Sequence, residues 1–173
     1  TMVAVAIVWR WLYNPQFGII NYFLGFFGIN PVNWLSDSRF AMPALIIMAA
    51  WKNFGYNMVI FLAGLQGIPQ QLYEAAEIDG ANAWQKFWAV IWPGISPTTF
   101  FIAIMSLIGG FQAGFDAAYV MTGGGPISAT TTIVQLIYQT AFSDFNYGRA
   151  SAEALILFAI IATFSFFQFK FLS

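Results

Sequence analysis

Three long apolar runs, separated by polar stretches, dominate the pattern of the chain. They cover residues 41–65, 94–113 and 150–169, and each is close to the ~20 residues that an α-helix needs to cross a bilayer. A shorter apolar run at 1–12 has no basic flank before it. We expect it to be the second half of a spanning helix whose start lies further upstream. The pattern therefore predicts three full membrane spans and one partial span.

Shorter segments connect the predicted spans. Residues 13–40 carry turn signals such as Asn14-Pro15, and the apolar piece inside this region is too short to span, so we expect an interfacial or re-entrant helix. The run Gly123-Gly124-Gly125-Pro126 predicts a tight turn, because it lacks the Gly-Lys-Ser/Thr ending and the preceding strand of a phosphate-binding loop. Residues 133–142 predict a short amphipathic helix.

The composition supports an all-α integral membrane chain. Of its 173 residues, 60% are hydrophobic and 8% are charged, whereas an ordinary soluble domain has about 25% charged residues. The net charge of −1 leaves no basic patch and argues against nucleic acid as a partner. The chain contains no His and no Cys, so we predict neither catalytic residues nor a metal site in it.

The polar stretch between the first two spans, residues 66–93, has the character of a docking segment. Six of its residues fall within one arc of a 3.6-residue helix, and they mix acidic with large apolar side chains: Glu74, Glu77, Ile78, Ala81, Gln85 and Trp88. A helix that lies on the lipid surface is the alternative, but such helices are usually rich in Lys and Arg. This stretch has three carboxylates and one Lys, so docking to a protein is favoured.

The segment QGIPQQLYEAAEIDGANAWQKFWAVIWPGISP, which begins at Gln66, resembles the EAA loop of ABC importer permeases. The likeness is to the carbohydrate-uptake family of the maltose and glycerol-phosphate type. Val90 and Trp92 stand where Ile and Leu are usual, and both remain apolar. Residues 138–142 favour the maltose-F-like member of the permease pair. Further similar stretches extend the resemblance over nearly the whole chain: 33–36, 51–52, 122–126 and 147–152.

The resemblance implies the core of a type I ABC importer transmembrane domain. Residues 1–173 would form a single, N-terminally truncated permease domain in a bacterial or archaeal cytoplasmic (inner) membrane, with a cytoplasmic coupling loop at 66–93. Gly80 is expected to end or kink the first helix of that loop, and Pro93 to mark re-entry into the membrane. The resemblance assigns coupling to the ATPase to Glu74, Ala75, Ala76, Asp79, Gly80 and Pro93.

The same resemblance implies the partners of the chain. They are an ATP-binding cassette ATPase dimer, a second, maltose-G-like permease subunit, an extracytoplasmic solute-binding protein, the sugar substrate and membrane lipid. The chain is expected to be a transport subunit without an ATPase site of its own. ATP and Mg²⁺ would be bound by the partner ATPase, and this chain would bind no cofactor.

Polar residues inside the first predicted span are candidates for the translocation pathway. A Lys at the centre of a span costs about 2.5–3.5 kcal/mol on insertion scales, so Lys52 is expected to face protein or water. Lys52, Asn53 and Tyr56 share one helical arc, with Trp51 beside it, and hydrogen-bond donors next to aromatic faces suit a sugar. The alternative is a packing stripe in which Lys52 pairs with a carboxylate such as Asp116, or with one on a partner chain.

The second predicted span carries a stripe of small residues. It serves either close helix packing, including Gly110-x-x-x-Gly114, or the wall of a roomy pathway. Aligned on Glu74, the substrate contacts of maltose-type permeases fall on Trp51, Lys52 and Tyr56 and on this stripe, whose small side chains argue against maltose itself. The stripe consists of Ser106, Gly109, Gly110 and Ala113.

The function predicted from these features is that of a permease subunit of an ATP-driven importer for a sugar or sugar-like solute. Movement of the docked coupling loop would drive alternating access as the spans rock. An ABC permease for another solute, such as a polyamine or a peptide, is the alternative. An ion channel or secondary carrier, which would need no ATPase, is a further one.

Overall fold

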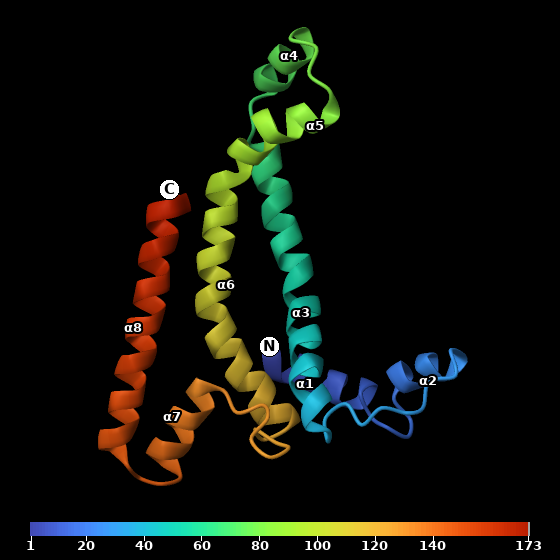
Figure 1. Cartoon of the computed structure of the whole chain (residues 1–173), viewed down its shortest axis with the longest axis vertical. Coiled ribbons are helices and arrows are strands. Elements are labelled where there is room, and N and C mark those ends of the chain that lie inside the picture. The colour runs from blue at the N-terminus through green and yellow to red at the C-terminus, as the bar shows by residue number, and fades with distance from the viewer. Residues whose placement is uncertain (173) are drawn as a thin grey trace. The chain divides into compact units, whose positions relative to one another are not determined.

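The computed structural model describes residues 1–172, apart from the side chains at positions 112, 113, 171 and 172. Every element of this described part is a helix (Figure 1). Three helical stretches are long and apolar enough to cross a membrane, judged by length and composition: Ser38–Gln66, Ala83–Met121 and Tyr147–Lys170. The predicted spans 41–65, 94–113 and 150–169 each fall inside one of them.

The chain order of the helices follows the apolar pattern. The long elements are α3 (Ser38–Gln66), α6 (Trp92–Met121) and α8 (Tyr147–Leu172). The short elements are α1 (Met2–Leu12), α2 (Ile19–Phe26), α4 (Gln70–Ile78), α5 (Ala83–Lys86), the π-helix η1 (Phe87–Ile91) and α7 (Ile133–Phe142). The apolar piece expected as a short non-spanning helix corresponds to α2, and the expected amphipathic helix to α7.

Packing divides the described chain into two units. The first contains residues 1–52 and 108–160, and the second contains residues 53–107 together with the end of α8. The core of the first unit is built where α1, the start of α3 and the end of α6 meet. Its alanines, such as Ala6, Ala44 and Ala118, are fully buried, and their small size lets the helices approach closely.

Two polar anchors hold the connecting segments of the first unit. The buried Tyr13 hydroxyl donates a hydrogen bond of 2.9 Å to the carbonyl of Ala44. The Asn21 side chain accepts from the Trp34 indole N–H at 2.9 Å and donates to the carbonyl of Val32, also at 2.9 Å. Because buried polar groups need partners, these bonds fix the loop between α1 and α3.

The predicted turn after α6 forms at the glycine run. Gly123 and Gly124 have φ of +63° and +91°, which is backbone that glycine adopts without strain. The fully buried Thr130 closes the turn, since its hydroxyl donates to the carbonyl of Gly125 at 2.7 Å and lies 2.6 Å from the hydroxyl of Thr122. The turn therefore has a structural role in the first unit.

Candidate functional site

The polar stretch between α3 and α6 begins with the helix α4, which ends at Gly80. Gly80 has φ of +72°, its N–H donates to the carbonyl of Glu77 at 3.0 Å, and the N–H of Ala81 donates to that of Ala76 at 2.9 Å. This pair of bonds is a Schellman motif, in which a glycine in the left-handed region satisfies the last carbonyls of a helix. Gly80 thus ends the helix, one of the two roles expected of it.

A second, short helix follows at once and is capped by Asn82. The Asn82 side chain accepts from the backbone N–H of Gln85 at 2.9 Å, and the Gln85 side chain accepts from the backbone N–H of Asn82 at 2.8 Å. This reciprocal pair is a capping box. Because the chain turns at Gly80 and restarts at Asn82, the expectation of one continuous arc from Glu74 to Trp88 is wrong.

An ion pair ties the two short helices together. The Nζ of Lys86, in α5, lies 3.0 Å from Oε1 of Glu77, in α4. In the part of the chain that the structure describes, neither Glu74 nor Asp79 takes part in an ion pair, and both are exposed. These two carboxylates therefore remain available to a partner.

The helix that returns toward the apolar run includes the last part of the polar stretch. Helical structure runs without a break from Ala83 through η1 into α6, so Pro93 lies inside this stretch. Its expected role as the point of re-entry into the membrane stays a prediction. Proline lacks an N–H and its ring clashes with the carbonyl four residues before it. The π-helix Phe87–Ile91 directly precedes this position, as expected where a helix widens to relieve such a conflict.

Close packing occurs next to these short helices, where the end of α3 and the residues that follow it meet the start of α6. A Cβ atom added to Gly64 would lie 2.5 Å from Oγ1 of Thr98, and one added to Gly94 would lie 2.7 Å from Cδ1 of Ile68. Both glycines therefore permit an approach that a larger residue would prevent. The short helices follow the end of α3 and precede the start of α6 (Figure 1), and these two contacts lie at that junction.

The surface of this loop suits insertion into another protein. No residue of α4 is buried, and two large apolar side chains of the loop are exposed, Ile78 of α4 by 87% and Trp84 of α5 by 69%. Large apolar and aromatic side chains left exposed among polar residues are typical of protein interaction sites. Ala75 is also exposed, so a partner's backbone can approach the helix closely there.

The residues predicted for the translocation pathway divide between the two units. Trp51, Lys52, Gly109 and Gly110 belong to the first unit, and Asn53, Tyr56 and Ser106 to the second. The side chain of Ala113 lies outside the described residues. Tyr56 is 70% exposed. No hydrogen bond or ion pair recorded among the described residues joins one of these side chains to another.

Lys52 does not pair with Asp116 in this chain. Three ion pairs occur among the described residues, and Lys52 is in none of them. The packing alternative that used Asp116 therefore lacks its contact, whereas a carboxylate on a partner chain remains an alternative to contact with substrate.

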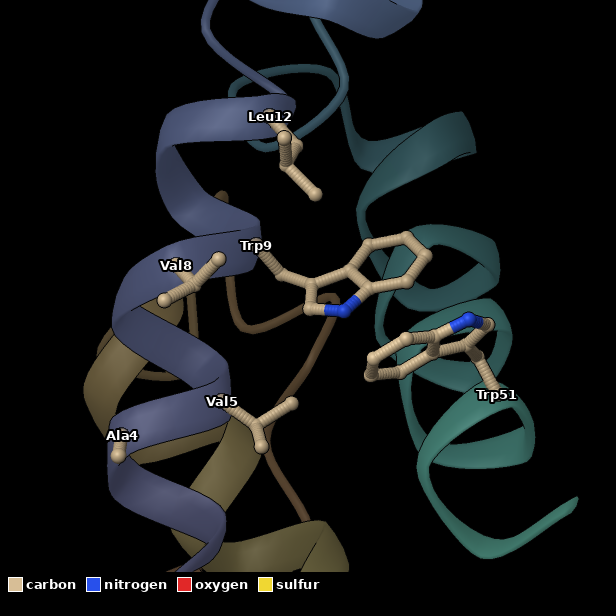
Figure 2. Close-up of a pocket in the computed structure, with 6 residues that line it drawn as sticks. All are labelled: Ala4, Val5, Val8, Trp9, Leu12 and Trp51. Atoms are coloured by element: carbon tan, nitrogen blue, oxygen red, sulfur yellow. The ribbon is translucent and has the colours of Figure 1, made fainter. Parts of the chain in front are cut away.

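Trp51 and Trp9 of α1 both line an apolar cavity of about 500 Å³, as Figure 2 shows. The two indole rings meet edge to face, with centroids 5.5 Å apart. The remaining lining is aliphatic and includes Val5, Val8 and Leu12. Sequence reasoning missed this contact, because no periodicity links residues in separate helices.

Other features of the site were also missed. Gly64 and Gly94 appear in the sequence as ordinary small residues of apolar helices, and their close approach depends on the pairing of α3 with α6. The capping box at Asn82 had a local signal, Asn followed three residues later by Gln, which could have predicted the second helix start.

Comparisons with known proteins bear on the whole described chain. A family model described as "Binding-protein-dependent transport system inner membrane component" matches residues 1–172. The sn-glycerol-3-phosphate transport system permease protein UgpA of Brucella abortus biovar 1 is 39% identical over 166 residues, which are 95% of this chain and 56% of that protein. Its counterpart in Yersinia enterocolitica is 37% identical, over 96% of this chain and 56% of that protein.

Solved structures of similar fold come from a bacterial ABC transporter involved in the import of the acidic polysaccharide alginate. One chain matches with a TM-score of 0.85 and 25% identity, over 99% of this chain and 60% of its own length. A complex of an alginate transporter with its pentasaccharide-bound periplasmic protein matches with a TM-score of 0.84. The predicted fold class, the transmembrane domain of an ABC importer, is confirmed. The chain spans between half and two thirds of the length of these relatives.

Proposed function

We propose, since this chain belongs to the family of inner-membrane components of binding-protein-dependent transport systems, that it forms the membrane-spanning core of an ABC importer permease subunit. The inner-membrane location expected from the sequence follows from this membership. The main support for this proposal is the exposed pair of helices, α4 and α5, between two candidate spans. In these helices Glu74 and Asp79 form no ion pair among the described residues. Such a projection suits docking into a separate ATPase.

The proposed mechanism depends on how the docking helices α4 and α5 are attached to the long helices α3 and α6. α4 and α5 are fastened to each other by the Lys86–Glu77 pair, and they stand on the close packing of α3 against α6 at Gly64. A displacement of α4 by a partner would therefore move the ends of both long helices as a body. Rigid-body rocking of this kind is a known way to switch a transporter between its two accessible states.

The proposed partners are those of an ATP-driven importer. We propose an ATP-binding cassette ATPase dimer, which would bind ATP and Mg²⁺, a second permease subunit of the maltose-G-like kind, and an extracytoplasmic solute-binding protein. This chain would bind no cofactor itself. Its assigned coupling residues would be Glu74, Ala75, Ala76, Asp79, Gly80 and Pro93.

The proposed solute is sugar-like and acidic. The similar permeases are named for sn-glycerol-3-phosphate and the similar structures for the import of acidic alginate, and both solutes combine hydroxyl groups with an anionic group. Hydroxyls suit the donors and aromatic faces proposed for the pathway around Lys52, Asn53 and Tyr56. The small residues Ser106, Gly109, Gly110 and Ala113 would form a wall of the pathway.

Reconstitution of the complete transporter tests this function. The full-length permease is purified from its host with its associated subunits, placed in proteoliposomes, and supplied with the cognate binding protein. We expect the ATPase to co-purify, and uptake of sn-glycerol-3-phosphate or an acidic oligosaccharide to require both ATP and the binding protein. Maltose, a polyamine and a dipeptide serve as comparison solutes. Uptake without ATP by the permease alone would contradict the proposal and favour a channel or secondary carrier.

A further inference from the structure

A polar cavity in the first unit has no role in the function described so far. It has a volume of about 310 Å³ and lies where the last turn of α1, the loop before α3 and the end of α6 come together. Six of its lining residues are Arg10, Tyr13, Asn14, Ser36, Met121 and Thr122. None of the residues that line it is an Asp or a Glu.

Arg10 gives this cavity a positive charge that the described part of the chain does not neutralise. The other two arginines are each paired with a carboxylate, Arg39 with Asp37 at 2.7 Å and Arg149 with Glu153 at 2.9 Å. No ion pair or hydrogen bond of the Arg10 side chain occurs among the described residues. A free guanidinium presents a planar fork of N–H donors, which matches a phosphate or a carboxylate.

The neighbouring side chains add donors and no competing anion. Oδ1 of Asn14 already accepts from the backbone N–H groups of Gln16 and Phe17, at 2.9 and 3.2 Å, so the Asn14 amide offers its NH₂ group. The Ser36 hydroxyl is exposed. The nearest acid in sequence, Asp37, is held by Arg39, whose hydrogen bonds lower the pKa of that carboxyl to about 2. Asp37 therefore stays ionised and paired with Arg39.

The cavity lies at the ends of α3 and α6 that belong to the first unit. α3 begins next to it and ends before α4, while α6 begins after η1 and ends at the cavity residue Met121. Two helices that cross the membrane place these opposite ends on opposite faces. With the α4–α5 loop on the cytoplasmic side, as proposed above, the cavity opens to the extracytoplasmic side, from which an imported solute arrives.

We propose that this cavity is an entry subsite for the acidic group of the solute, a phosphate or a carboxylate held by Arg10, Asn14 and Ser36. The inference rests on the proposed import function, because that function sets the direction of transport. A lipid phosphate has the same chemistry, so the test must separate the two sources.

A thiol reporter in the cavity gives a direct test. The chain contains no Cys, so Ser36→Cys introduces one thiol into it, and Ser143→Cys provides a control at an exposed position between α7 and α8. The full transporter, in nanodiscs of phosphatidylcholine, is labelled with an uncharged maleimide while inorganic phosphate is titrated against chloride at equal ionic strength. We expect phosphate to slow labelling at Ser36→Cys and to leave Ser143→Cys unchanged.

Variants of Arg10, made in the Ser36→Cys background, test whether the positive charge of Arg10 is needed for phosphate to protect the thiol from labelling. Arg10→Gln is expected to raise the phosphate concentration for half-protection by roughly tenfold, the loss typical of a charge-assisted hydrogen bond at an exposed site. For Arg10→Lys, this phosphate concentration should lie between those of the unmodified transporter and Arg10→Gln, because lysine keeps the positive charge but lacks the planar fork of N–H donors. Arg149→Gln, which removes a paired arginine, should match the unmodified transporter. No protection by phosphate, or equal protection in Arg10→Gln, would overturn the inference.

Two further arms identify the source of the anion. In nanodiscs that contain phosphatidylglycerol, slow labelling that added phosphate does not change would assign the cavity to a lipid headgroup and overturn the entry subsite. In proteoliposomes, Arg10→Gln should raise the KM for sn-glycerol-3-phosphate and spare kcat. A transporter that imports this solute normally but shows no phosphate protection refutes the subsite alone, whereas failure of ATP-driven uptake in the unmodified transporter refutes the proposed function.

Discussion

At the residue scale, Gly80 shows how one position shapes the docking surface. Its φ of +72° allows the carbonyls at the end of α4 to be satisfied and the chain to turn into α5. A Cβ at this position would meet nothing within 4 Å, so the cost of a larger residue is one of backbone conformation alone. Gly28, which ends α2 with the same φ of +72° and equally open surroundings, is a natural reference.

Gly80→Ala and Gly28→Ala should therefore cost the same in backbone strain, about 1–2 kcal/mol. Only Gly80→Ala is expected to lower ATP-driven uptake, because it alters the presentation of α4 to the ATPase. The measurement is uptake in proteoliposomes, normalised to the amount of assembled transporter. Equal loss in the two variants would show that Gly80 contributes stability and not coupling.

Glu74 carries the second prediction at this scale. It is an exposed carboxylate without an ion pair among the described residues, so Glu74→Lys should leave the subunit in the membrane and weaken the ATPase complex. Reversal of an interfacial charge is expected to cost about 2 kcal/mol or more, a roughly thirtyfold loss of affinity. Retention of the ATPase during purification measures it.

A charge reversal elsewhere controls for net charge. Asp144 is exposed between α7 and α8, outside the proposed docking surface, and Asp144→Lys should retain the ATPase. Normal uptake and normal ATPase retention in Glu74→Lys would remove Glu74 from the coupling role.

Tyr56 tests the proposed pathway. Tyr56 and Phe54 both belong to α3 and are each 70% exposed, so neither side chain owes much to packing within this chain. Tyr56→Ala should lower uptake by about tenfold through the loss of a hydrogen bond and a stacking face, while Phe54→Ala should not. Subunit yield and basal ATPase activity should be normal in both.

The alternative, in which this stripe packs against a partner chain, predicts an effect on assembly instead of on uptake. If this stripe packs against a partner chain, Tyr56→Ala should reduce the yield of assembled transporter, and Lys52→Met should be tolerated or stabilising. Unchanged uptake and yield in both variants would take these residues out of the pathway.

At the element scale, the link between the docking helices and the spans depends on the contact of α3 with α6. A Cβ on Gly64 would lie 2.5 Å from Oγ1 and 3.0 Å from Cγ2 of Thr98, and a β-branched side chain has little freedom to move away. In the same helix, a Cβ on Gly55 would meet nothing within 4 Å. The two glycines thus have opposite roles in one element.

Gly64→Ala is expected to destabilise the assembled transporter by about 1–3 kcal/mol through overpacking. Gly55→Ala should be neutral or slightly stabilising, because alanine is the better helix former. Thr98→Ala removes Oγ1 and Cγ2 but keeps Cβ, which would lie 3.0 Å away, so it should recover part of the loss in the double variant. Thermal unfolding of the purified complex measures the stability of the three single variants and of the double variant Gly64→Ala/Thr98→Ala. If the stability changes of Gly64→Ala and Thr98→Ala simply added in the double variant, the direct contact would be contradicted.

At the scale of the whole molecule, the order of the helices fixes which ends share a face of the membrane. Within the second unit, the rings of Phe100 and Phe169 lie with centroids 6.1 Å apart, so the start of α6 and the end of α8 lie together. The chain leaves the coupling loop through α6 and returns through α8. The coupling loop and the end of α8 should therefore be on the cytoplasmic side.

Cysteine labelling in intact cells tests this topology. Asn82→Cys, in the coupling loop, and Lys170→Cys, near the end of α8, should both resist a membrane-impermeant maleimide until the cells are permeabilised. Ser143→Cys, between α7 and α8, should react in intact cells. Labelling of only one of the first two would contradict an even number of crossings between them.

The sequence by itself determined the class of the molecule and the position of its docking segment. Long apolar runs can be stable only as spanning helices, since lipid offers no partner to backbone groups. The docking segment around Glu74 could be located from a local motif. The end of α4 could be predicted at Gly80, because it depends on the backbone conformation of that one residue. The same local motif indicates the family.

Tertiary structure decided what depends on neighbours distant in sequence. The break between α4 and α5 moved Trp88 off the arc of Glu74, and the return helix begins at Ala83, after the capping box of Asn82, with Pro93 inside it. The contact of Gly64 with Thr98 and the cavity beside Arg10 join separate helices. Periodicity reports which face of a helix is apolar and not which helix covers it, so these features arise only when the helices pack.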